Sequence, residues 1–106
     1  MRRYEIILAQ EAEKDLRGAV NYIAKNLCEP AAAENLLNCF EETVLSLETM
    51  PQQFPVIPEI SLPSYGIRMI PVKNYLAFYT VNEDAKAVYL IRFLYGKRNW
   101  IELLKE

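Results

Sequence analysis

The sequence predicts an α+β fold in the order β-α-α-β-β-β, in which a helical hairpin packs on one face of a small, mostly antiparallel sheet. Residues 11–50 contain two stretches in which apolar residues recur every three or four positions, which is the spacing of amphipathic helices. Residues 67–95 contain three apolar, aromatic-rich runs separated by short polar turns, which is typical of antiparallel strands. We expect one domain over residues 1–106, because a chain of this length buries a sufficient core without disulfides.

The first half of the chain is predicted to form one strand and two helices. The strand covers Arg3–Leu8, and the first helix covers Glu11–Leu27. The second helix begins at Pro30, where the missing N–H of proline costs nothing, and stops at Met50-Pro51. Because two or three residues join the helices, we expect an antiparallel hairpin. The apolar stripes of the two helices are Ala12, Leu16, Ala19, Val20, Ile23 and Leu27, and Ala33, Leu36, Phe40, Val44 and Leu47.

The second half is predicted to form an irregular connector, three strands and a short tail. Prolines in residues 51–65 indicate that the connector is extended and lies inside the domain. The strands are expected at Ile67–Val72, Tyr75–Val81 and Ala87–Tyr95. The turns Lys73-Asn74 and Asn82-Glu83-Asp84 suit hairpins, because Asn and Asp tolerate left-handed backbone conformations. The tail, Asn99–Lys105, is predicted to form one or two helical turns.

The last two strands are apolar on both faces, whereas a half-solvated antiparallel strand should alternate apolar and polar residues. In the last strand, Arg92 interrupts the apolar phase of Val88, Leu90 and Leu94. The helical hairpin covers only one face of the sheet. We therefore expect exposed apolar surface on the second face, which marks an interface. The alternative is that the connector and the tail cover this second face.

Charge is unevenly distributed along the chain. Residues 1–64 carry five basic and ten acidic side chains, and residues 65–106 carry seven basic and four acidic ones, giving net charges of −5 and +3. This asymmetry favours an anionic partner for the second half. No apolar run is long enough to span a membrane and the N-terminus does not resemble a signal peptide, so we expect a cytoplasmic location.

The residue types exclude several kinds of chemistry. The chain has no histidine, so the commonest general base and the familiar Ser-His-Asp triad are absent. Gly18, Gly66 and Gly96 are too scattered for a phosphate-binding loop. Cys28 and Cys39 are eleven positions apart and lack the spacing of a zinc site. We therefore expect reduced cysteines, no metal and no cofactor.

The remaining candidates are cations interleaved with aromatic residues in the last third of the chain. Arginine binds phosphate and carboxylate groups through paired hydrogen bonds, and aromatic rings stack on unpaired bases. Such a set could hold RNA or bind an acidic protein segment. Its members are Arg68, Lys73, Arg92, Lys97 and Arg98, with Tyr65, Tyr75, Tyr79, Tyr89, Tyr95 and Trp100.

Three segments carry a family resemblance: AEKDLRGAVNYI (Ala12–Ile23), NYLAFYTV (Asn74–Val81) and VYLIRFLYGKRNWIELL (Val88–Leu104). With the predicted element order, they resemble the RelE/ParE toxins of bacterial type II toxin–antitoxin modules, over essentially the whole chain. The resemblance implies a growth-arresting toxin of a plasmid-stabilisation module. Its partner would be a cognate antitoxin protein, encoded beside it and bound in a toxin–antitoxin hetero-oligomer, and it would have no membrane partner.

The resemblance implies one of two targets, DNA gyrase or the ribosome with its mRNA. ParE-like toxins inhibit gyrase by binding it, whereas RelE-like toxins cleave ribosome-bound mRNA. Two catalytic positions of the nucleases correspond here to Arg98 and Arg68. A third, an arginine, falls on or beside Leu76, and a C-terminal tyrosine position falls near Leu104. These departures favour gyrase binding. The alternative is a ribosome-dependent mRNA endoribonuclease with Arg98 and Arg68 as catalytic residues, and the second alternative is a member that only binds its antitoxin.

Two sets of contact residues follow from the resemblance and from the predicted exposure of the second sheet face. Arg98 follows Gly96-Lys97 where the last strand ends, so we expect its side chain to lie outside the core. The residues predicted to contact the target are Arg98, Lys97, Arg92, Lys73, Tyr95 and Trp100. The residues predicted to contact the antitoxin are Tyr75, Tyr79, Leu90, Arg92 and Leu94.

Overall fold

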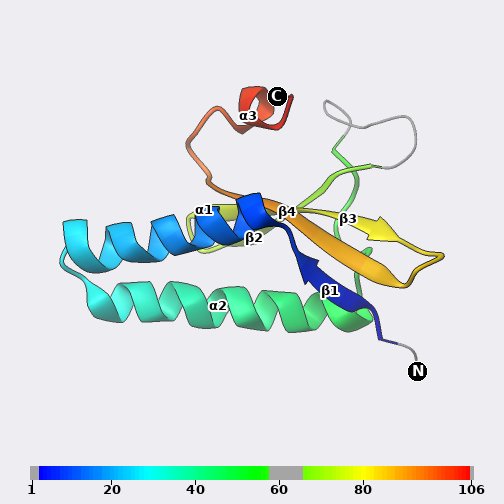
Figure 1. Cartoon of the computed structure of the whole chain (residues 1–106), viewed down its shortest axis with the longest axis horizontal. Helices are drawn as coiled ribbons and strands as arrows, with labels where there is room; N and C mark the ends of the chain where they lie inside the picture. The colour runs from blue at the N-terminus through cyan, green and yellow to red at the C-terminus, as the bar shows by residue number, and fades with distance from the viewer. Residues whose placement is uncertain (1–2, 58–65, 106) are drawn as a thin grey trace.

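The computed structural model describes residues 3–57 and 66–105, and within them the predicted order of elements is confirmed (Figure 1). Helices α1 and α2 lie side by side as the expected hairpin (Figure 1). The elements are β1 (Glu5–Leu8), α1 (Gln10–Asn21), the π-helical turn η1 (Tyr22–Asn26), α2 (Pro30–Thr49), β2 (Arg68–Val72), β3 (Tyr75–Asn82), β4 (Ala87–Tyr95) and α3 (Trp100–Lys105).

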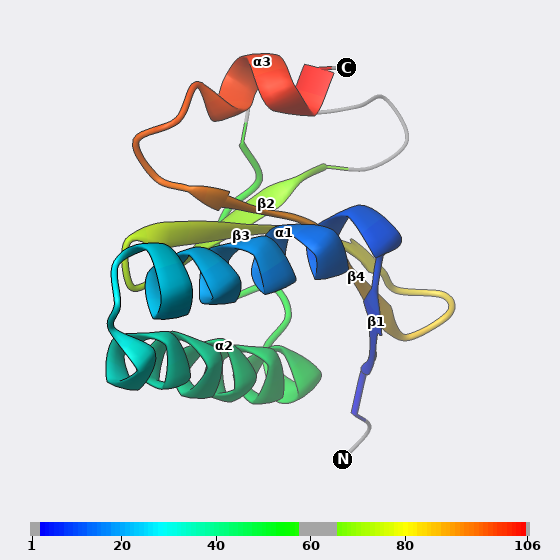
Figure 2. The ribbon, with the colours of Figure 1, turned by 60° about the vertical axis from the view of Figure 1, so that its left-hand side comes forward.

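The strands form one mixed sheet in the order β1-β4-β3-β2. The last strand, β4, pairs in parallel with β1 and antiparallel with β3, and β3 pairs antiparallel with β2. Figure 2 shows α1 and α2 on one side of the sheet and α3 on the other. The α+β class, with a helical hairpin on one face of a mostly antiparallel sheet, is confirmed.

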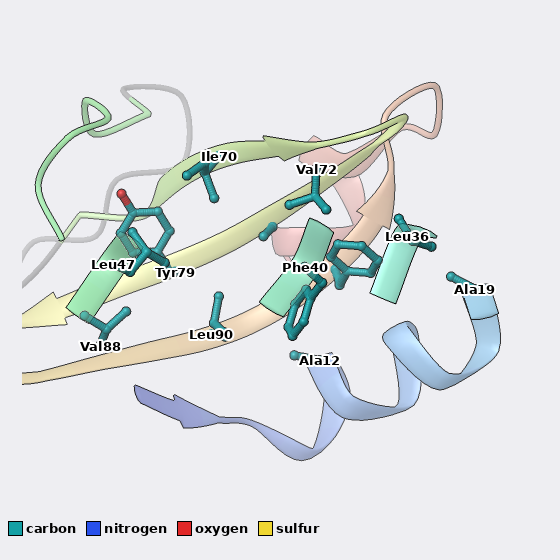
Figure 3. Close-up of a cluster of buried hydrophobic side chains, with 12 residues drawn as sticks. Ala12, Ala19, Leu36, Phe40, Leu47, Ile70, Val72, Tyr79, Val88 and Leu90 are labelled. Atoms are coloured by element: carbon teal, nitrogen blue, oxygen red, sulfur yellow. The ribbon is translucent and has the colours of Figure 1, made fainter. Parts of the chain in front are cut away.

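The main core lies between the helical hairpin and the sheet (Figure 3). The ring of Phe40 in α2 packs edge-on against that of Phe93 in β4, with the ring centroids 5.3 Å apart. Both predicted helical stripes contribute to the core, because their buried members face the sheet. These buried members are Ala12 and Ala19 of α1 and Ala33, Leu36, Phe40 and Leu47 of α2.

The first helix changes geometry before its predicted end at Leu27. The α-helix ends at Asn21 and continues as η1, after which the Leu27 N–H donates to the Tyr22 carbonyl at 3.1 Å. Leu27 is consequently half-exposed and does not join the core stripe. Cys28 then takes a φ of 54°, a left-handed conformation that turns the chain toward α2.

The second face of the sheet carries a separate, smaller core. Phe78 and Leu94 are at most 1% exposed, and the Trp100 ring of α3 packs on Phe78 with the centroids 5.4 Å apart. Leu103 and Leu104 of α3 and Ile57 of the connector complete this cluster. The prediction that this part of the second face is open is therefore wrong. The alternative, a cover made by the connector and the tail, is the arrangement found.

A β-bulge in β4 explains why Arg92 breaks the apolar pattern. Phe78 lies opposite Arg92, but its neighbour Tyr79 lies opposite Leu90, so Ile91 is an extra residue in β4. The inserted residue shifts the alternation of side chains. Leu90 and Phe93 therefore both belong to the main core, and Ile91 packs with the second core.

The hairpin turns lie where they were predicted, but the left-handed residues in them are not the expected Asn and Asp. The left-handed positions are Lys73, with a φ of 57°, and Lys86, with a φ of 53°, and not Asn or Asp. Asn82 contributes through its side chain, because its Oδ1 accepts a hydrogen bond from the Ala85 N–H at 3.0 Å. Asn82 therefore stabilises the turn through a side-chain hydrogen bond, and Lys86 provides the left-handed backbone.

Candidate functional site

Several predicted target-binding residues meet where the β2–β3 turn and the end of β4 lie together. The Gly96 N–H donates to the Asn74 carbonyl at 2.8 Å, and the Arg98 N–H donates to the Tyr95 carbonyl at 3.0 Å. A Cβ atom at position 96 would lie 3.1 Å from the Asn74 oxygen, so glycine permits this close approach. Lys73, Lys97 and Arg98 are exposed at this end of the sheet.

Arg98 borders a hollow of about 290 Å³ between α1 and the sheet, which we call the Arg98 groove. Its aromatic wall is ordered by ring contacts: Tyr75 stacks on Phe93 with the centroids 5.1 Å apart and meets Tyr95 edge-on at 5.5 Å. Burial, followed by the neighbouring Tyr95 and Tyr22, raises the pKa of the Tyr75 phenol, so its hydroxyl is neutral at physiological pH. The groove is lined by Lys14, Asp15, Gly18, Ala19, Tyr75, Phe93, Tyr95 and Arg98.

The α1 side of the groove was not predicted from the sequence. Lys14 and Gly18 are one helical turn apart and share a face. Gly18 leaves space there, because a Cβ atom at this position would meet no other atom of the described residues within 4 Å. That spacing is the only signal in the sequence. It does not tell which end of the sheet the helix face meets, because this depends on the parallel pairing of β1 with β4.

Arg92, predicted to contact both target and antitoxin, instead joins α1 to β4. Its Nε lies 2.7 Å from Asp15 Oδ2 and its Nη2 lies 3.2 Å from Asp15 Oδ1. Asp15 Oδ2 also accepts the Phe93 N–H at 3.0 Å. This ion pair positions α1 along β4. Only 24% of the Arg92 side chain is exposed, so its geometry supports neither the predicted contact with the target nor the one with the antitoxin.

Arg68 lies at the opposite end of the sheet from Arg98. It pairs with Tyr79, whereas Val72, four residues further along β2, pairs with Tyr75 at the groove, a separation of about 13 Å along the strand. The Arg68 guanidinium donates to the Phe54 carbonyl and is partly buried. The two arginines proposed for catalysis are therefore not brought together.

Three residues predicted to bind the antitoxin are core residues. Tyr79 is fully buried and Leu90 is 2% exposed, both beneath the helical hairpin, and Leu94 is 1% exposed beneath α3. The prediction that they contact a partner is wrong for this structure, because the sheet is covered on both faces at these positions. Tyr75 is partly exposed in the Arg98 groove. Trp100, predicted to bind the target, packs on Phe78.

Tyr79 also carries an unusual polar atom. Among the described residues, no hydrogen-bond partner satisfies its buried hydroxyl, which is visible at the edge of the core in Figure 3. Burial raises the pKa of this phenol, and the Arg68 guanidinium and the Phe54 backbone partly oppose that effect. The phenol is therefore neutral at physiological pH.

The fold is that of a small α+β protein with a helical hairpin on one face of a mixed sheet. The family described as "ParE toxin of type II toxin-antitoxin system, parDE" matches residues 6–100, so the chain belongs to the ParE toxin family. By the description of this family, its function is that of a toxin in a type II toxin–antitoxin system, and an antitoxin is the partner class that the description implies. Among curated proteins, none matches this sequence.

Two solved structures share the fold. A chain of the chromosomal ParDE toxin–antitoxin system from P. aeruginosa superposes with a TM-score of 0.70 at 19% identity, covering 89% of this chain and 97% of its own. A chain of the archaeal RelE–RelB complex from Pyrococcus horikoshii OT3 gives a TM-score of 0.61 at 19% identity, covering 90% and 97%. Within residues 3–57 and 66–105, no helix is long and apolar enough to cross a membrane.

Proposed function

We propose that this chain arrests growth by binding a protein target such as DNA gyrase through the Arg98 groove, without cleaving RNA. The separation of Arg68 from Arg98 carries this proposal, because a nuclease needs its cations around a single phosphate. The other two positions at which RelE-like nucleases carry polar residues fall on or beside Leu76 and near Leu104, and both leucines pack in the second core. Neither leucine can transfer a proton.

The groove is suited to an acidic protein segment. Arg98 and Lys14 supply positive charge at its border, and the stacked rings of Tyr75 and Phe93 form a fixed apolar wall. A carboxylate can be held bidentately by a guanidinium, and an apolar neighbour in the same segment can pack on the aromatic wall. Tyr95, 36% exposed, extends this wall toward solvent.

The test combines an assay on the purified protein with an assay on cells in which the protein has been induced. We expect it to inhibit gyrase supercoiling, and we expect primer extension on mRNA from induced cells to show no new cuts within codons on translating ribosomes. An Arg98→Ala variant should lose the inhibition. Cuts at the ribosomal A site would instead support the endoribonuclease. Antitoxin binding without any growth arrest would support a member that has kept only that interaction.

A further inference from the structure

A second and larger hollow lies at the other end of the sheet. Its volume is about 640 Å³, within the range of about 300–1,000 Å³ typical of ligand-binding pockets. We call it the hairpin hollow, because the β3–β4 turn forms its rim. It is lined by Ala9, Thr80, Val81, Asn82, Glu83, Asp84, Tyr89 and Ile91.

The hairpin hollow belongs to the second face of the sheet, beside the part that α3 covers. Tyr79 is in the main core, so its neighbour Thr80 faces the other way. Thr80 pairs with Tyr89 across the two strands. The second core is centred on Phe78 and Leu94, nearer the start of β3 and the end of β4. Part of the second face is therefore available to a partner, although not the part predicted from the sequence.

Thr80 indicates that the hollow receives a polar group. Thr80 is only 7% exposed, and among the described residues it is the polar residue that is buried to this degree. Thr80 lines the hollow, and its hydroxyl is not among the buried side-chain atoms that lack a partner, so water in the hollow can reach it. A group that enters the hollow and displaces this water has to replace its hydrogen bond.

The rim selects a cationic group. Asp84 is exposed and makes no ion pair with any residue in the described ranges. Glu83 accepts hydrogen bonds from Tyr4 and Gln52 and pairs with the Lys86 ammonium, so the negative charge that the rim offers to a partner is that of Asp84. Below the rim, Tyr89 and Ile91 present apolar surface.

We propose that the hairpin hollow binds an arginine or lysine side chain from a segment of the antitoxin. The aliphatic stem would pack on Tyr89 and Ile91, the charged head would pair with Asp84, and an N–H would donate to the Thr80 hydroxyl. Arginine in a desolvated pocket is a common anchor of stable interfaces, which is why this pocket suits a lasting partner better than a transient target. The inference rests on the assignment of the chain as a toxin of such a module.

The two binding sites are far enough apart to be tested separately. Tyr75 pairs with Tyr95 at the Arg98 groove, and Asn82 pairs with Ala87 beside the hollow, seven residues along β3 and so about 23 Å away. Changes in the hollow should therefore weaken antitoxin binding and leave the toxic activity of the free chain intact.

The experiment measures the dissociation constant of the full chain for the purified protein encoded by the neighbouring reading frame. We expect Asp84→Lys to weaken binding by at least about tenfold, and Thr80→Val, which keeps the shape of the side chain, to weaken it severalfold. The control is Glu34→Lys, which makes the same charge change at an exposed position of α2. It should bind within about twofold of wild type. Circular dichroism and melting temperature confirm that each variant is folded.

Three outcomes would overturn the proposal: unchanged binding in both hollow variants, equal weakening by Asp84→Lys and Glu34→Lys, or loss of growth arrest by the hollow variants. Failure of the proposed function would look different. In that case the wild-type chain would bind its antitoxin through the hollow but would not arrest growth, and Arg98→Ala would change neither property.

Discussion

The carboxylate of Asp15 closes the edge of β4 beyond the point where β1 ends. β1 pairs with β4 only as far as Leu90, so the backbone of the next residues lacks a strand partner on that side. Asp15 accepts the Phe93 N–H and holds the Arg92 guanidinium at the same time. One side chain thus keeps α1 beside the strand and shapes the wall of the Arg98 groove.

Replacing Asp15 by alanine should destabilise the fold by about 2–3 kcal/mol, because it leaves a partly buried guanidinium and a backbone N–H without their acceptor. Urea denaturation measures this free energy. Glu13→Ala is the matched control, since Glu13 pairs with Arg17 on the solvent side of the same helix. It should cost no more than about 0.5 kcal/mol. Equal losses in the two variants would contradict the role given to Asp15.

Arg98→Ala should reduce growth arrest by at least about tenfold while the free energy of unfolding changes by no more than about 0.5 kcal/mol. The reason is that the side chain is exposed and borders the groove. Colony counts after induction, at matched expression, measure the effect. Lys97→Ala should do less, and Lys25→Ala, in η1, should do nothing. A fully toxic Arg98→Ala variant would remove the groove from the mechanism.

Tyr79→Phe should stabilise the protein by about 1 kcal/mol at pH 7, because it removes a buried hydroxyl that has no partner among the described residues. The pKa of Tyr79 in the folded protein is raised above the unfolded value of 10.0, so the phenol ionises first in the unfolded chain. The wild-type protein therefore keeps its full stability below pH 10.0 and loses stability as the pH rises toward the folded pKa. The advantage of the variant should therefore grow above about pH 10. Denaturation at several pH values tests this. Tyr22→Phe, at a half-exposed position, should be neutral at pH 7.

At the scale of the elements, α3 is a short helix whose apolar side chains cover the part of the second sheet face around Phe78 and Leu94. Trp100, Leu103 and Leu104 all point into the second core. Six residues are too few to form a stable helix alone, so α3 depends on these contacts. The same contacts shield Phe78 and Leu94 from water, and the helix and the sheet therefore stabilise each other.

Trp100→Ala should cost about 2 kcal/mol of stability and increase the fluorescence of a dye that binds exposed apolar surface, because it uncovers Phe78. Glu102→Ala, an exposed position of the same helix, is the control and should change stability by less than about 0.5 kcal/mol. A Trp100→Ala protein that is as stable as wild type and does not bind the dye would show that α3 is not needed as a cover.

The helices and strands were predictable because each has its own periodicity or turn signals, as the buried stripe from Ala33 to Leu47 illustrates. The bulge at Ile91 was not predictable. When a strand is apolar on both faces, its sequence does not show where the alternation of side chains between the two faces is interrupted. The position of α3 could not be predicted for a related reason. The apolar second face could be covered either by a partner or by the connector and the tail, and the sequence does not distinguish the two. For the candidate site, the exposed Arg98 turn was predictable, whereas Lys14 and Asp15 depend on how α1 crosses the sheet.

At the scale of the whole molecule, two surfaces of different character lie at the two ends of the sheet. The Arg98 groove is basic and aromatic, and the hairpin hollow is apolar with an acidic rim. Oppositely charged surfaces that are well separated allow one protein to recognise two partners without a shared contact. The charge asymmetry along the sequence therefore corresponds only in part to the distribution of charge on the surface. The acidic rim of the hairpin hollow comes from residues 65–106, the half of the chain with net positive charge.

Co-expression with the neighbouring reading frame should give a hetero-oligomer that stays intact on gel filtration at about 1 µM, because a stable interface of this kind buries more than about 1,000 Å². Raising the salt concentration should weaken the complex, since the hollow is proposed to hold a charged side chain near its rim. Separate elution of the two proteins at low salt would remove the support for a stable toxin–antitoxin pair.

The central place of β4 also has a consequence for how the protein is made. The chain makes β4 after β1, β2 and β3, and β1 pairs only with residues 87–90 of β4. The Arg98 groove takes Phe93, Tyr95 and Arg98 from the end of β4 and the turn after it. The groove is therefore assembled only after β4 has joined β1 to β3.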